Sequence, residues 1–544
     1  MKKQKIVSAA IAMACSAPAL AGGLLTNTNQ NVAFNRMMSR EASIGIDGVY
    51  YNPAGVVFMG EGHHLSINWQ LAYQTRTIEN DYALFKNNVN NPTTPRAFKG
   101  NAFAPVIPSF QYAYNKGNWS FQANFALTGG GGKCTFDDGL GSFEKIVSET
   151  AMAAYGLAAT VDNVLGQAIN RPGMEMFTSD QAFGKGGKYS YESYMHGRQY
   201  YYGLSLGAAY KVNEHFSAFA GVRGVYASCN YYGYVKNIKV GNMPLYQVLD
   251  PTKEDAANIE LSCDQSGLGF TPIIGVDFKT GKWNFSAKYE FKTRMRLKNK
   301  SVNQAPSIGN LPANLSASMN QVLVGQYVQA GLPQDQAKIM AENTTNAVLS
   351  NQTVVATMQG LKTQFDTKLE EAIGEYEDGK KIAGDIPAYL TLGVGYKPID
   401  MVRINVGFHW FDDKHATSYN HRNEKLKRGT LEYNAGVEVD VCKKITLSTG
   451  WQSTNYGLPN EDVNTAHEQR YMDDKSFVTS SNSAAIGGVY HINKKMDLNV
   501  AYFHTFYQHK KTAEEVEVGS NKLTYGSDYN RNNNVFAVGL DINF

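Results

Sequence analysis

The sequence of 544 residues has few charges, few cysteines and no excess of either sign of charge. Only 18% of its residues are charged, and residues 22–544 contain 48 basic and 48 acidic side chains. A nucleic-acid-binding protein needs a basic face to meet phosphates, so this balance argues against one. Beyond the N-terminus, no apolar run approaches the roughly 18 residues that a membrane-spanning helix needs. A bundle of membrane helices is therefore excluded.

Aromatic residues and glycine are abundant instead. The chain has 33 Tyr, 26 Phe and 51 Gly, and its mean hydropathy is −0.35. Many aromatics, few charges and modest hydropathy are typical of long strands with one apolar and one polar face. Soluble multidomain enzymes fit this composition poorly.

Residues 1–21 have the composition of an export signal peptide. Three lysines precede an apolar stretch from Ile6 to Ala17, and Ala19-Leu20-Ala21 is a small-residue cleavage site. We therefore expect cleavage after Ala21.

Four cysteines remain after such cleavage, namely Cys134, Cys229, Cys263 and Cys442. They are too scattered for a disulfide-rich scaffold or for a zinc site with close ligand pairs. Cys229 and Cys263 flank one loop, and the sequence leaves open whether they pair in an oxidising compartment.

The body of the chain alternates apolar and polar residues with a period of two. After Trp119, Phe121 and Phe125 fall on one face, and Gln122 and Asn124 fall on the other. Successive strand side chains point to opposite faces, so a barrel wall in lipid alternates apolar outside and polar inside. Several of these runs reach ten residues or more, the length that a tilted strand needs to cross a bilayer.

This alternation assigns a face to each residue of the predicted wall. The residues predicted to face lipid include Phe121, Phe291, Val406 and Leu540. The lumenal set between residues 285 and 297 is predicted to be Ser286, Lys288, Glu290, Lys292, Arg294 and Arg296. Because buried unpaired charges are costly, we expect the lumenal charges to compensate one another as ion pairs.

The last strand and the connections indicate how the wall closes. Alternating apolar residues from Phe536 to the terminal Phe544 resemble the assembly signal of bacterial outer-membrane proteins. Counting strands between short and long connections gives fourteen. Because backbone groups in lipid must pair, we expect an all-β, closed transmembrane antiparallel barrel in the bacterial outer membrane. The long connections are expected at about 80–103, 132–196, 236–265, 300–385, 417–428, 456–478 and 513–530.

Two of the long connections carry helical patterns and are predicted to be helical extracellular insertions, at about 137–170 and 315–378. Val354, Met358 and Leu361 follow three- and four-residue spacing, as do Leu157 and Val161. These apolar stripes either pack on each other and cap the barrel, or form a landing surface for an apolar ligand.

Residues 22–60, before the first long strand, contain Asn52-Pro53-Ala54. An Asn-Pro-Ala at this position resembles the FadL family of outer-membrane long-chain fatty-acid and hydrocarbon transporters. Further segments resemble the family in the same order: Ala104–Tyr112, Trp119–Gly132, Tyr289–Lys292 and Asp385–Tyr396. In the third of these, the Arg and Ser of the family's Tyr-Arg-Ser are replaced. The resemblance spans most of the chain from Gly22 to Phe544.

The resemblance implies an N-terminal hatch, residues 22–60, that plugs a barrel formed by residues 61–544. Asn52, Pro53 and Ala54 would be the hatch motif, which we expect to seat the plug in the lumen.

The resemblance also implies a lateral opening where the third strand kinks inward. In this sequence the kink would lie at Gly129, Gly130, Gly131 and Gly132, because glycine permits the backbone angles of a bulge or wall gap. The alternative is that these glycines only begin a flexible loop. A fatty acid gains about 0.8 kcal/mol per buried CH₂, so an apolar pocket with a side exit suits it better than a water-filled pore.

The expected function is outer-membrane transport of hydrophobic small molecules, most of all long-chain fatty acids, by a monomer without cofactor or metal. A carboxylate head group in the lumen needs a cation, and Arg294 and Arg403 are the candidates; each could instead be a structural ion-pair partner. The alternatives are a general diffusion porin and a surface adhesin. The sequence leaves open which external loop captures ligand.

We do not expect an enzyme. The chain has no Gly-x-Ser-x-Gly, which a lipase would need. His409, Asp412, Asp413 and His415 lie close together near the outer end of one strand, where such groups are usually a solvated strand end rather than a catalytic or metal site.

Overall fold

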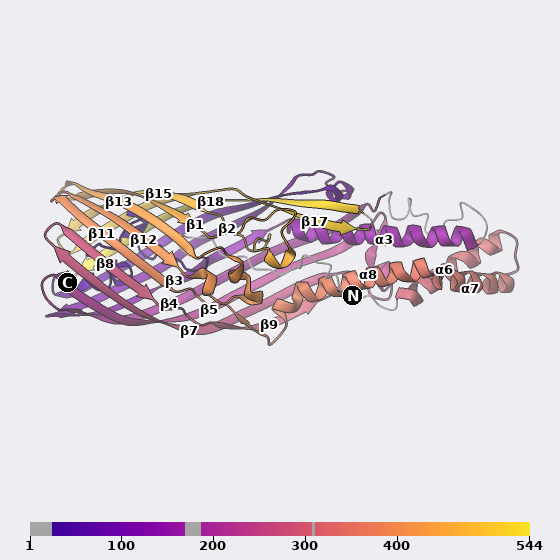
Figure 1. Cartoon of the computed structure of the whole chain (residues 1–544), viewed down its shortest axis with the longest axis horizontal. Coiled ribbons are helices and arrows are strands. Elements are labelled where there is room, and N and C mark those ends of the chain that lie inside the picture. Colours follow the sequence, from indigo (N-terminus) through magenta and orange to yellow (C-terminus); the bar gives the residue numbers. More distant parts are fainter. Residues whose placement is uncertain (1–23, 169–185, 307–310, 520) are drawn as a thin grey trace.

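The computed structural model describes residues 24–168, 186–306, 311–519 and 521–544. The predicted export signal lies outside these residues. Their strands form one antiparallel sheet that closes on itself, because β1 (Gly62–Tyr82) pairs with both β2 (Arg96–Lys116) and β18 (Asn521–Asn543). Figure 1 shows the resulting barrel with helices projecting from one end.

The barrel wall is a ring of fourteen described strands, in the order β1, β2, β3, β4, β5, β7, β8, β11, β12, β13, β14, β15, β16 and β18. The predicted closed barrel is thus confirmed. The other ring strands are β3 (Trp119–Phe136), β4 (Tyr189–Lys211), β5 (Phe216–Val240), β7 (Ile259–Thr280), β8 (Trp283–Glu290), β11 (Tyr389–Ile399), β12 (Val402–Phe411), β13 (Thr430–Cys442), β14 (Ile445–Asn455), β15 (Ser481–Asn493) and β16 (Met496–Tyr507). Four further strands extend the wall at one end: β6 (Met243–Pro244), β9 (Arg296–Gln304), β10 (Lys381–Ala383) and β17 (Lys510–Val518).

Short turns close one end of the barrel, the end where the C-terminus lies, and long connections leave the other (Figure 1). We call these the short-turn end and the loop end. Strands extend into several expected connections: β1 and β2 cover nearly half of 80–103, β5 and β7 cover part of 236–265, and β17 and β18 cover nearly all of 513–530. The strands extend this far because their inward side chains, such as Val235, Ile238 and Leu261, are buried in an apolar cluster.

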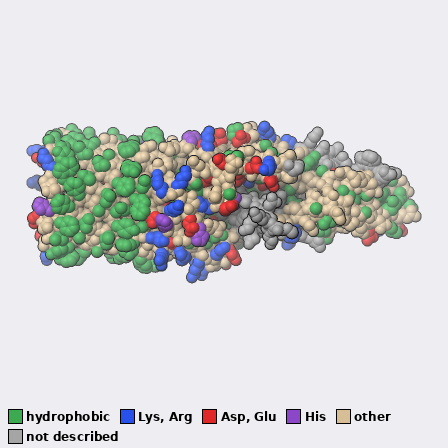
Figure 2. All heavy atoms as spheres, viewed as in Figure 1, with side chains coloured by type: hydrophobic (Ala, Val, Ile, Leu, Met, Phe, Trp, Pro, Cys, Tyr) green, Lys and Arg blue, Asp and Glu red, His purple; other side chains and the backbone are tan. Residues whose placement is uncertain are grey.

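Figure 2 shows an apolar band on one face of the barrel at the short-turn end, and exposed apolar side chains occur on strands all around the ring. Phe121, Phe291 and Val406 are exposed on it, as the alternation predicts, and Leu540 is partly exposed. The described helices include none that is long and apolar enough to cross a membrane.

The alternation changes phase between β8 and β9. Up to Glu290, even-numbered residues are buried; beyond the break, Thr293, Met295 and Leu297 are buried. The prediction that Arg294 faces the lumen is therefore wrong, because its side chain is exposed on the outer surface. The same phase change turns Lys292 and Arg296 outward.

Four long helices form a stalk beyond the loop end (Figure 1): α3 (Gly141–Ala168), α6 (Leu311–Gln329), α7 (Gln334–Leu349) and α8 (Gln352–Ile373). They lie in the two segments for which helices are predicted. The apolar stripe of α3 (Leu157, Val161) packs with that of α8 (Val354, Met358) in one buried cluster. The stripes pack on each other, as the first interpretation has it, and are not an exposed landing surface.

The lumen at the short-turn end is filled by residues 24–60, the hatch. It contains α1 (Val32–Met37), α2 (Gly48–Tyr51) and η1 (Gly55–Phe58), and nearly all of its side chains are buried. Asn31 caps α1 by accepting the Ala33 N–H at 2.7 Å. The remaining short helices are α5 (Leu245–Leu249), η2 (Ala83–Asn87), η3 (Gly374–Tyr376), η4 (Asp413–His415), η5 (Tyr419–Lys425) and η6 (His467–Gln469).

Candidate functional site

The ladder between β2 and β3 is interrupted at mid-length. The two strands pair from Ser109 to Lys116 and again from Gly100 to Phe103, but residues 104–108 of β2 have no partner on β3. The facing stretch of β3, residues 127–132, stays paired with β4. The ladder is therefore broken between two strands that each keep their other neighbour, and we call this break the opening.

Two sequence features produce this opening. Pro105 and Pro108 deprive β2 of two backbone donors. Along β3, the register against β4 shifts at Thr128 and again at Gly131, which makes two bulges. Gly130 has φ +71°, and a Cβ there would clash with the carbonyl oxygen of Gln199, so this position requires glycine.

The hatch supplies the hydrogen bonds that β2 does not. The Asn27 N–H donates to the Thr128 carbonyl at 2.8 Å, and the Asn27 side-chain amide donates to the Leu127 carbonyl at 3.0 Å. Thr26 and Gly129 form an isolated bridge. Unpaired backbone groups in lipid cost several kcal/mol each, so these bonds allow β3 to leave β2. The predicted kink residues thus lie at the opening.

The lumenal side of the opening is apolar. Ala104, Ile107 and Leu127 are buried there in one cluster with Phe34 and Tyr51 of the hatch. On the outside, Pro105 and Val106 are exposed, and the Trp69 indole N–H donates to the Pro105 carbonyl at 2.9 Å. An apolar molecule in the lumen therefore meets apolar side chains up to the wall.

From the opening to the loop end, the lumen is lined by a large apolar and aromatic cluster. It includes Cys134, Tyr201, Tyr231, Phe477 and Tyr529. Cys229 and Cys263 are free thiols on adjacent strands and do not form a disulfide. We call this region the outer half of the lumen and the region filled by residues 24–60 the hatch half.

Two arginines lie within the outer half. Arg76 of β1 and Arg531 of β18 are directly opposite each other in the ladder, and they are 1% and 4% exposed. The guanidinium carbon of Arg531 lies 4.6 Å from the ring centre of Phe477, and that of Arg76 lies 5.9 Å from it. Arg76 also pairs with Gly100 of β2, and the opening begins at Ala104, four residues further along the same strand. The two arginines therefore lie near the edge of the opening that faces the loop end.

Arg531 has no carboxylate partner among the residues that the structure describes, although Tyr507 is a polar neighbour, with its ring centre 6.0 Å from the guanidinium carbon. None of its three guanidinium nitrogens forms a hydrogen bond there, and neither does the Asn533 amide or Gln74 Nε2. Burying a cation without an acceptor is expensive. An anion beside Arg531 would meet side-chain donors that are not otherwise used, within the apolar and aromatic cluster of the outer half, which we call the chamber.

The two arginines predicted from the sequence do not lie in this chamber. Arg403 is at the short-turn end, where it donates to Asp440 at 2.6 and 2.7 Å and to Glu438 at 3.1 Å. Its position is that of a structural ion-pair partner. Arg294 is on the outer surface, as described above.

The hatch motif is held by three wall strands. The Asn52 amide donates to Asp277 Oδ2 at 2.6 Å, the Pro53 carbonyl accepts from Gln122 at 2.7 Å, and the Ala54 carbonyl accepts from Ser217 Oγ at 2.7 Å. The Asn52 side chain also accepts the Gly55 N–H at 3.2 Å, which closes the turn.

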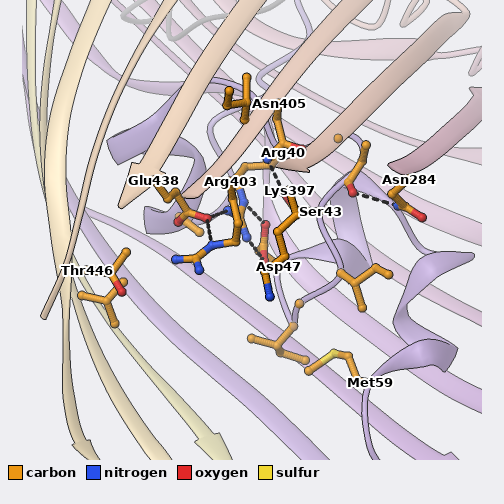
Figure 3. Close-up of a pocket in the computed structure, with 18 of the residues that line it drawn as sticks. Arg40, Ser43, Asp47, Met59, Asn284, Lys397, Arg403, Asn405, Glu438 and Thr446 are labelled. Atoms are coloured by element: carbon orange, nitrogen blue, oxygen red, sulfur yellow. Dashed lines mark hydrogen bonds and ion pairs between the residues drawn. The ribbon is translucent and has the colours of Figure 1, made fainter. Parts of the chain in front are cut away.

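Buried ion pairs join the hatch to the wall. Glu438 of β13 accepts from Arg36, from Arg40 at 3.1 Å and from Arg403, while Arg40 also pairs with Asp47 at 2.7 Å. Figure 3 shows Arg40, Arg403 and Glu438 converging beside a hollow of about 430 Å³ between hatch, wall and short turns.

Glu41 of the hatch is held by His409, whose imidazole lies 2.7 Å from Glu41 and 2.8 Å from Glu432. Burial acts to raise the pKa of the Glu41 carboxyl, but the charge of His409 and its hydrogen bond overcome this and lower the pKa. Glu41 is therefore a bound carboxylate at neutral pH.

The predicted lumenal charges of β8 compensate one another. Glu290 accepts from Lys288 at 2.9 Å and from both Arg223 nitrogens at 2.6 and 3.0 Å. Lys288 also donates to the Tyr50 carbonyl of the hatch at 2.7 Å.

The His and Asp cluster after β12 does not converge on one point. His409 is buried between carboxylates, whereas His415 is exposed and pairs with Asp412 at 2.6 Å. In the described part of the chain, no group of three or more His, Cys, Asp or Glu side chains is arranged to hold a metal ion.

Comparison with known proteins gives a likeness in fold only. No protein-family model matches the chain, and no curated protein matches it. Among solved structures, a Pseudomonas aeruginosa FadL homologue shares 13% identity with a TM-score of 0.56, over 96% of this chain and 100% of that one. The Ralstonia pickettii toluene transporter TbuX shares 14% (TM-score 0.44; 92% and 94% covered), and the Pseudomonas putida toluene transporter TodX 13% (0.46; 98% and 100%).

The first of these likenesses shows the fold. The chain has the FadL-type barrel, so the resemblance seen in the sequence is confirmed at the level of architecture. A closed barrel of this fold with an outward apolar band is an outer-membrane protein.

Proposed function

We propose that this protein transports hydrophobic small molecules into the outer membrane, with long-chain fatty acids as the principal substrates. Substrate is captured at the loop end, held in the outer half of the lumen and released sideways between β2 and β3. The observation that carries this proposal is the opening at residues 104–108 and 127–132, which has an apolar lumenal side and hydrogen bonds from the hatch.

The lining of the lumen favours this route over passage along the barrel axis. A bound acyl chain would lose about 0.8 kcal/mol for each CH₂ that left apolar surroundings. The hatch half offers buried polar and charged groups, such as Glu41, Arg36 and Glu438, instead. The same filled lumen disfavours a general diffusion porin. The similar structures are named as transporters, and we propose no enzymatic step.

The unpartnered Arg531 supports a carboxylate-bearing substrate within this class. A fatty-acid carboxylate accepts hydrogen bonds in pairs, which a guanidinium donates. With the head group at Arg531, the acyl chain would extend among Cys134, Tyr201 and Leu127 toward the opening. Arg531 thus replaces Arg294 and Arg403 as the proposed anchor.

The exit is tested by restoring the ladder. Pro105→Thr and Pro108→Thr return two backbone donors to β2, and deletion of Gly131 makes the facing stretches equal at five residues each. In bacteria that display this variant, uptake of a labelled long-chain fatty acid should fall to the level of cells without the protein. Slower exchange of the amides at 104–108 reports that the strands have paired.

Pro398→Thr, at a short turn, is the matched control and should leave uptake unchanged. Full uptake together with slow amide exchange at residues 104–108 would show that substrate leaves elsewhere.

The anchor is tested with Arg531→Gln and two ligands of equal chain length. Hydrogen bonds to charged groups contribute about 1.5–3 kcal/mol, so fatty-acid binding should weaken roughly 10- to 100-fold. Binding of the uncharged alkane should not change, and Arg531→Lys should recover part of the loss. Equal losses for both ligands would mean that Arg531 only supports the packing of the chamber.

A further inference from the structure

Five cations lie on the outward face of one stretch of wall. The phase change after Phe291 points every second residue outward, and Lys292, Arg294, Arg296, Lys298 and Lys300 are all exposed. Alternate residues of a strand are about 6.6 Å apart, and Lys292 and Arg294 precede β9 in the break after β8, so these side chains form a row at most roughly 26 Å long. We call this row the cationic strip.

The described residues offer the strip two carboxylates: the buried Asp385, and the exposed Asp264 of β7, which lies directly opposite Lys300 in the ladder. Its one ion pair joins Arg296 to Asp385 at 2.9 Å. Lys298 lies directly opposite another exposed lysine, Lys381 of β10, and Lys292 donates to the carbonyl of His415 at 3.1 Å. Like charges directly opposite each other destabilise a sheet and opposite charges stabilise it, so five cations facing two carboxylates leave the strip with a net positive charge.

The strip begins where the apolar band ends. Phe291 borders the strip on the side of the short-turn end. Leu268 and Phe270 of the adjacent β7 are 60% and 62% exposed. A Cβ on Gly269 would lie only 3.1 Å from the Arg294 carbonyl oxygen, so the neighbouring Leu268 and Phe270 lie beside the strip. Figure 2 shows Lys and Arg side chains gathered beside the border of the hydrophobic surface. We infer that lipid head groups meet the protein at this border, because the apolar band is the part of the wall that suits the hydrocarbon core.

From this placement we propose that the cationic strip binds the phosphorylated head group of a lipid in the outer leaflet of the membrane. Phosphates attract clustered Lys and Arg beside a bilayer, and Arg294 and Arg296 can each donate two hydrogen bonds to one phosphate. The acyl chains of the same lipid would cover Leu268, Phe270 and Phe291. A soluble anion would leave these apolar side chains unmatched.

The length of the strip indicates the kind of head group. A single phosphate contacts one or two of these side chains, whereas a row of up to roughly 26 Å matches a head group with several anionic groups that extends away from the bilayer. A multiply phosphorylated glycolipid has this form. The strip would fix the depth of the barrel at the face formed by β7, β8 and β9.

The test uses the whole protein in detergent micelles and lipid A as the probe, in its diphosphorylated form and with both phosphates removed. The variant is Arg294→Gln, Lys298→Gln and Lys300→Gln together. Each cation at a membrane surface contributes roughly fivefold to affinity, so the triple variant should bind diphosphorylated lipid A about a hundredfold more weakly. The matched control replaces three outward cations of other strands: Lys99→Gln, Lys133→Gln and Lys239→Gln.

The proposal requires that the wild type prefer diphosphorylated lipid A, that the strip variant lose this preference and that the control keep it. Equal binding of both lipid forms by the wild type would overturn it, as would equal losses in the two variants. Displacement of lipid A by millimolar inorganic phosphate would assign the strip to a free anion instead. Because all these side chains are exposed, circular dichroism of the variants should match that of the wild type.

Discussion

Both halves of the lumen contain buried ion pairs, such as Arg96 with Glu144 in the outer half, but they differ in how one buried arginine is accommodated. In the hatch half, charges of the plug meet charges of the wall, as Arg36 and Arg40 do at Glu438 and Glu41 does at His409. In the outer half, an apolar and aromatic chamber surrounds Arg531, which has no hydrogen-bond partner in the described structure.

This difference indicates what each half is built for. Complementary ion pairs need no further ligand, so the charges of the hatch half hold the hatch against the wall. An unpartnered guanidinium in an apolar chamber is stable only if other packing offsets its cost or a ligand supplies the acceptor. The opening between β2 and β3 lies where the two halves meet, at Asn27 and Thr128.

The largest expected effect comes from breaking the charge pairing of the hatch half. Glu438→Gln would leave Arg36, Arg40 and Arg403 without the carboxylate that joins them. Breaking a buried pair by removing one partner costs about 3–5 kcal/mol. We expect urea unfolding in lipid vesicles to show a loss of this size, and single-channel recordings to show intermittent ion conductance as the hatch leaves its seat.

Two control variants show how large the effects of Glu438→Gln are. Glu424→Gln removes an exposed partner of His421 and should change stability by less than about 1 kcal/mol. Deletion of residues 22–55 sets the conductance of a barrel without its hatch. If Glu438→Gln unfolds like the wild type and shows no ion conductance, the ion pairs do not hold the hatch.

A second prediction distinguishes the outer surfaces of the two ends. Val406 is exposed in the apolar band, and Val302 is 81% exposed on β9 beyond it. Arg at a lipid-facing site costs about 2–4 kcal/mol near the bilayer midplane and about 0–1 near the interface. Val406→Arg should therefore destabilise the barrel in vesicles, whereas Val302→Arg should not. Equal effects would mean that the band does not mark the bilayer.

The barrel could be predicted from the sequence because strand alternation is local. The face of Phe121 follows from Gln122 and the residues beside them, whatever the rest of the chain does. The hatch motif could be placed for a similar reason, since Asn52 and Pro53 define a turn by their own chemistry.

The phase change at Phe291 could not be predicted in this way. It depends on Thr293, which exchanges two backbone hydrogen bonds of 3.0 Å with Ile386, and on Asp385, which accepts the Met295 N–H at 2.9 Å. These partners follow the helical insertion, far along the chain. If the alternation is extended across this break, it predicts that Arg294 faces the lumen, which is the wrong side of the wall.

The proposed anchor was also missed for a physical reason. Arg531 lies in the run Arg531-Asn532-Asn533-Asn534, beside a segment expected to be a long polar connection. Its burial results from β18 continuing toward the loop end and from Phe477, which packs over it from another loop. Neither follows from nearby residues.

The smallest expected effect concerns a second charge of the outer half. Asp413 is buried between Leu24, whose N–H donates to Oδ1 at 3.2 Å, and Thr430, whose N–H donates to Oδ2 at 3.2 Å. Burial raises the pKa of the Asp413 carboxyl from 3.8 to about 6, although both hydrogen bonds act to lower it. Since the folded state holds the proton more tightly, this carboxyl stabilises the fold below pH 3.8 and loses that contribution as the pH rises through about 6.

The effect of Asp413→Asn on the free energy of unfolding should therefore depend on pH. Above pH 6 the amide avoids burying a carboxylate, so the free energy of unfolding should rise by about 1–2 kcal/mol. This rise is smaller than the full pKa shift of Asp413 implies, because the amide has only one acceptor oxygen for the two N–H donors. Near pH 4 wild type and variant should be equally stable or the variant slightly less so. Urea unfolding in vesicles at several pH values measures the difference. A constant difference across the range would show that Asp413 keeps its charge throughout, and the outer half would then hold a stably buried carboxylate as the hatch half does at Glu41.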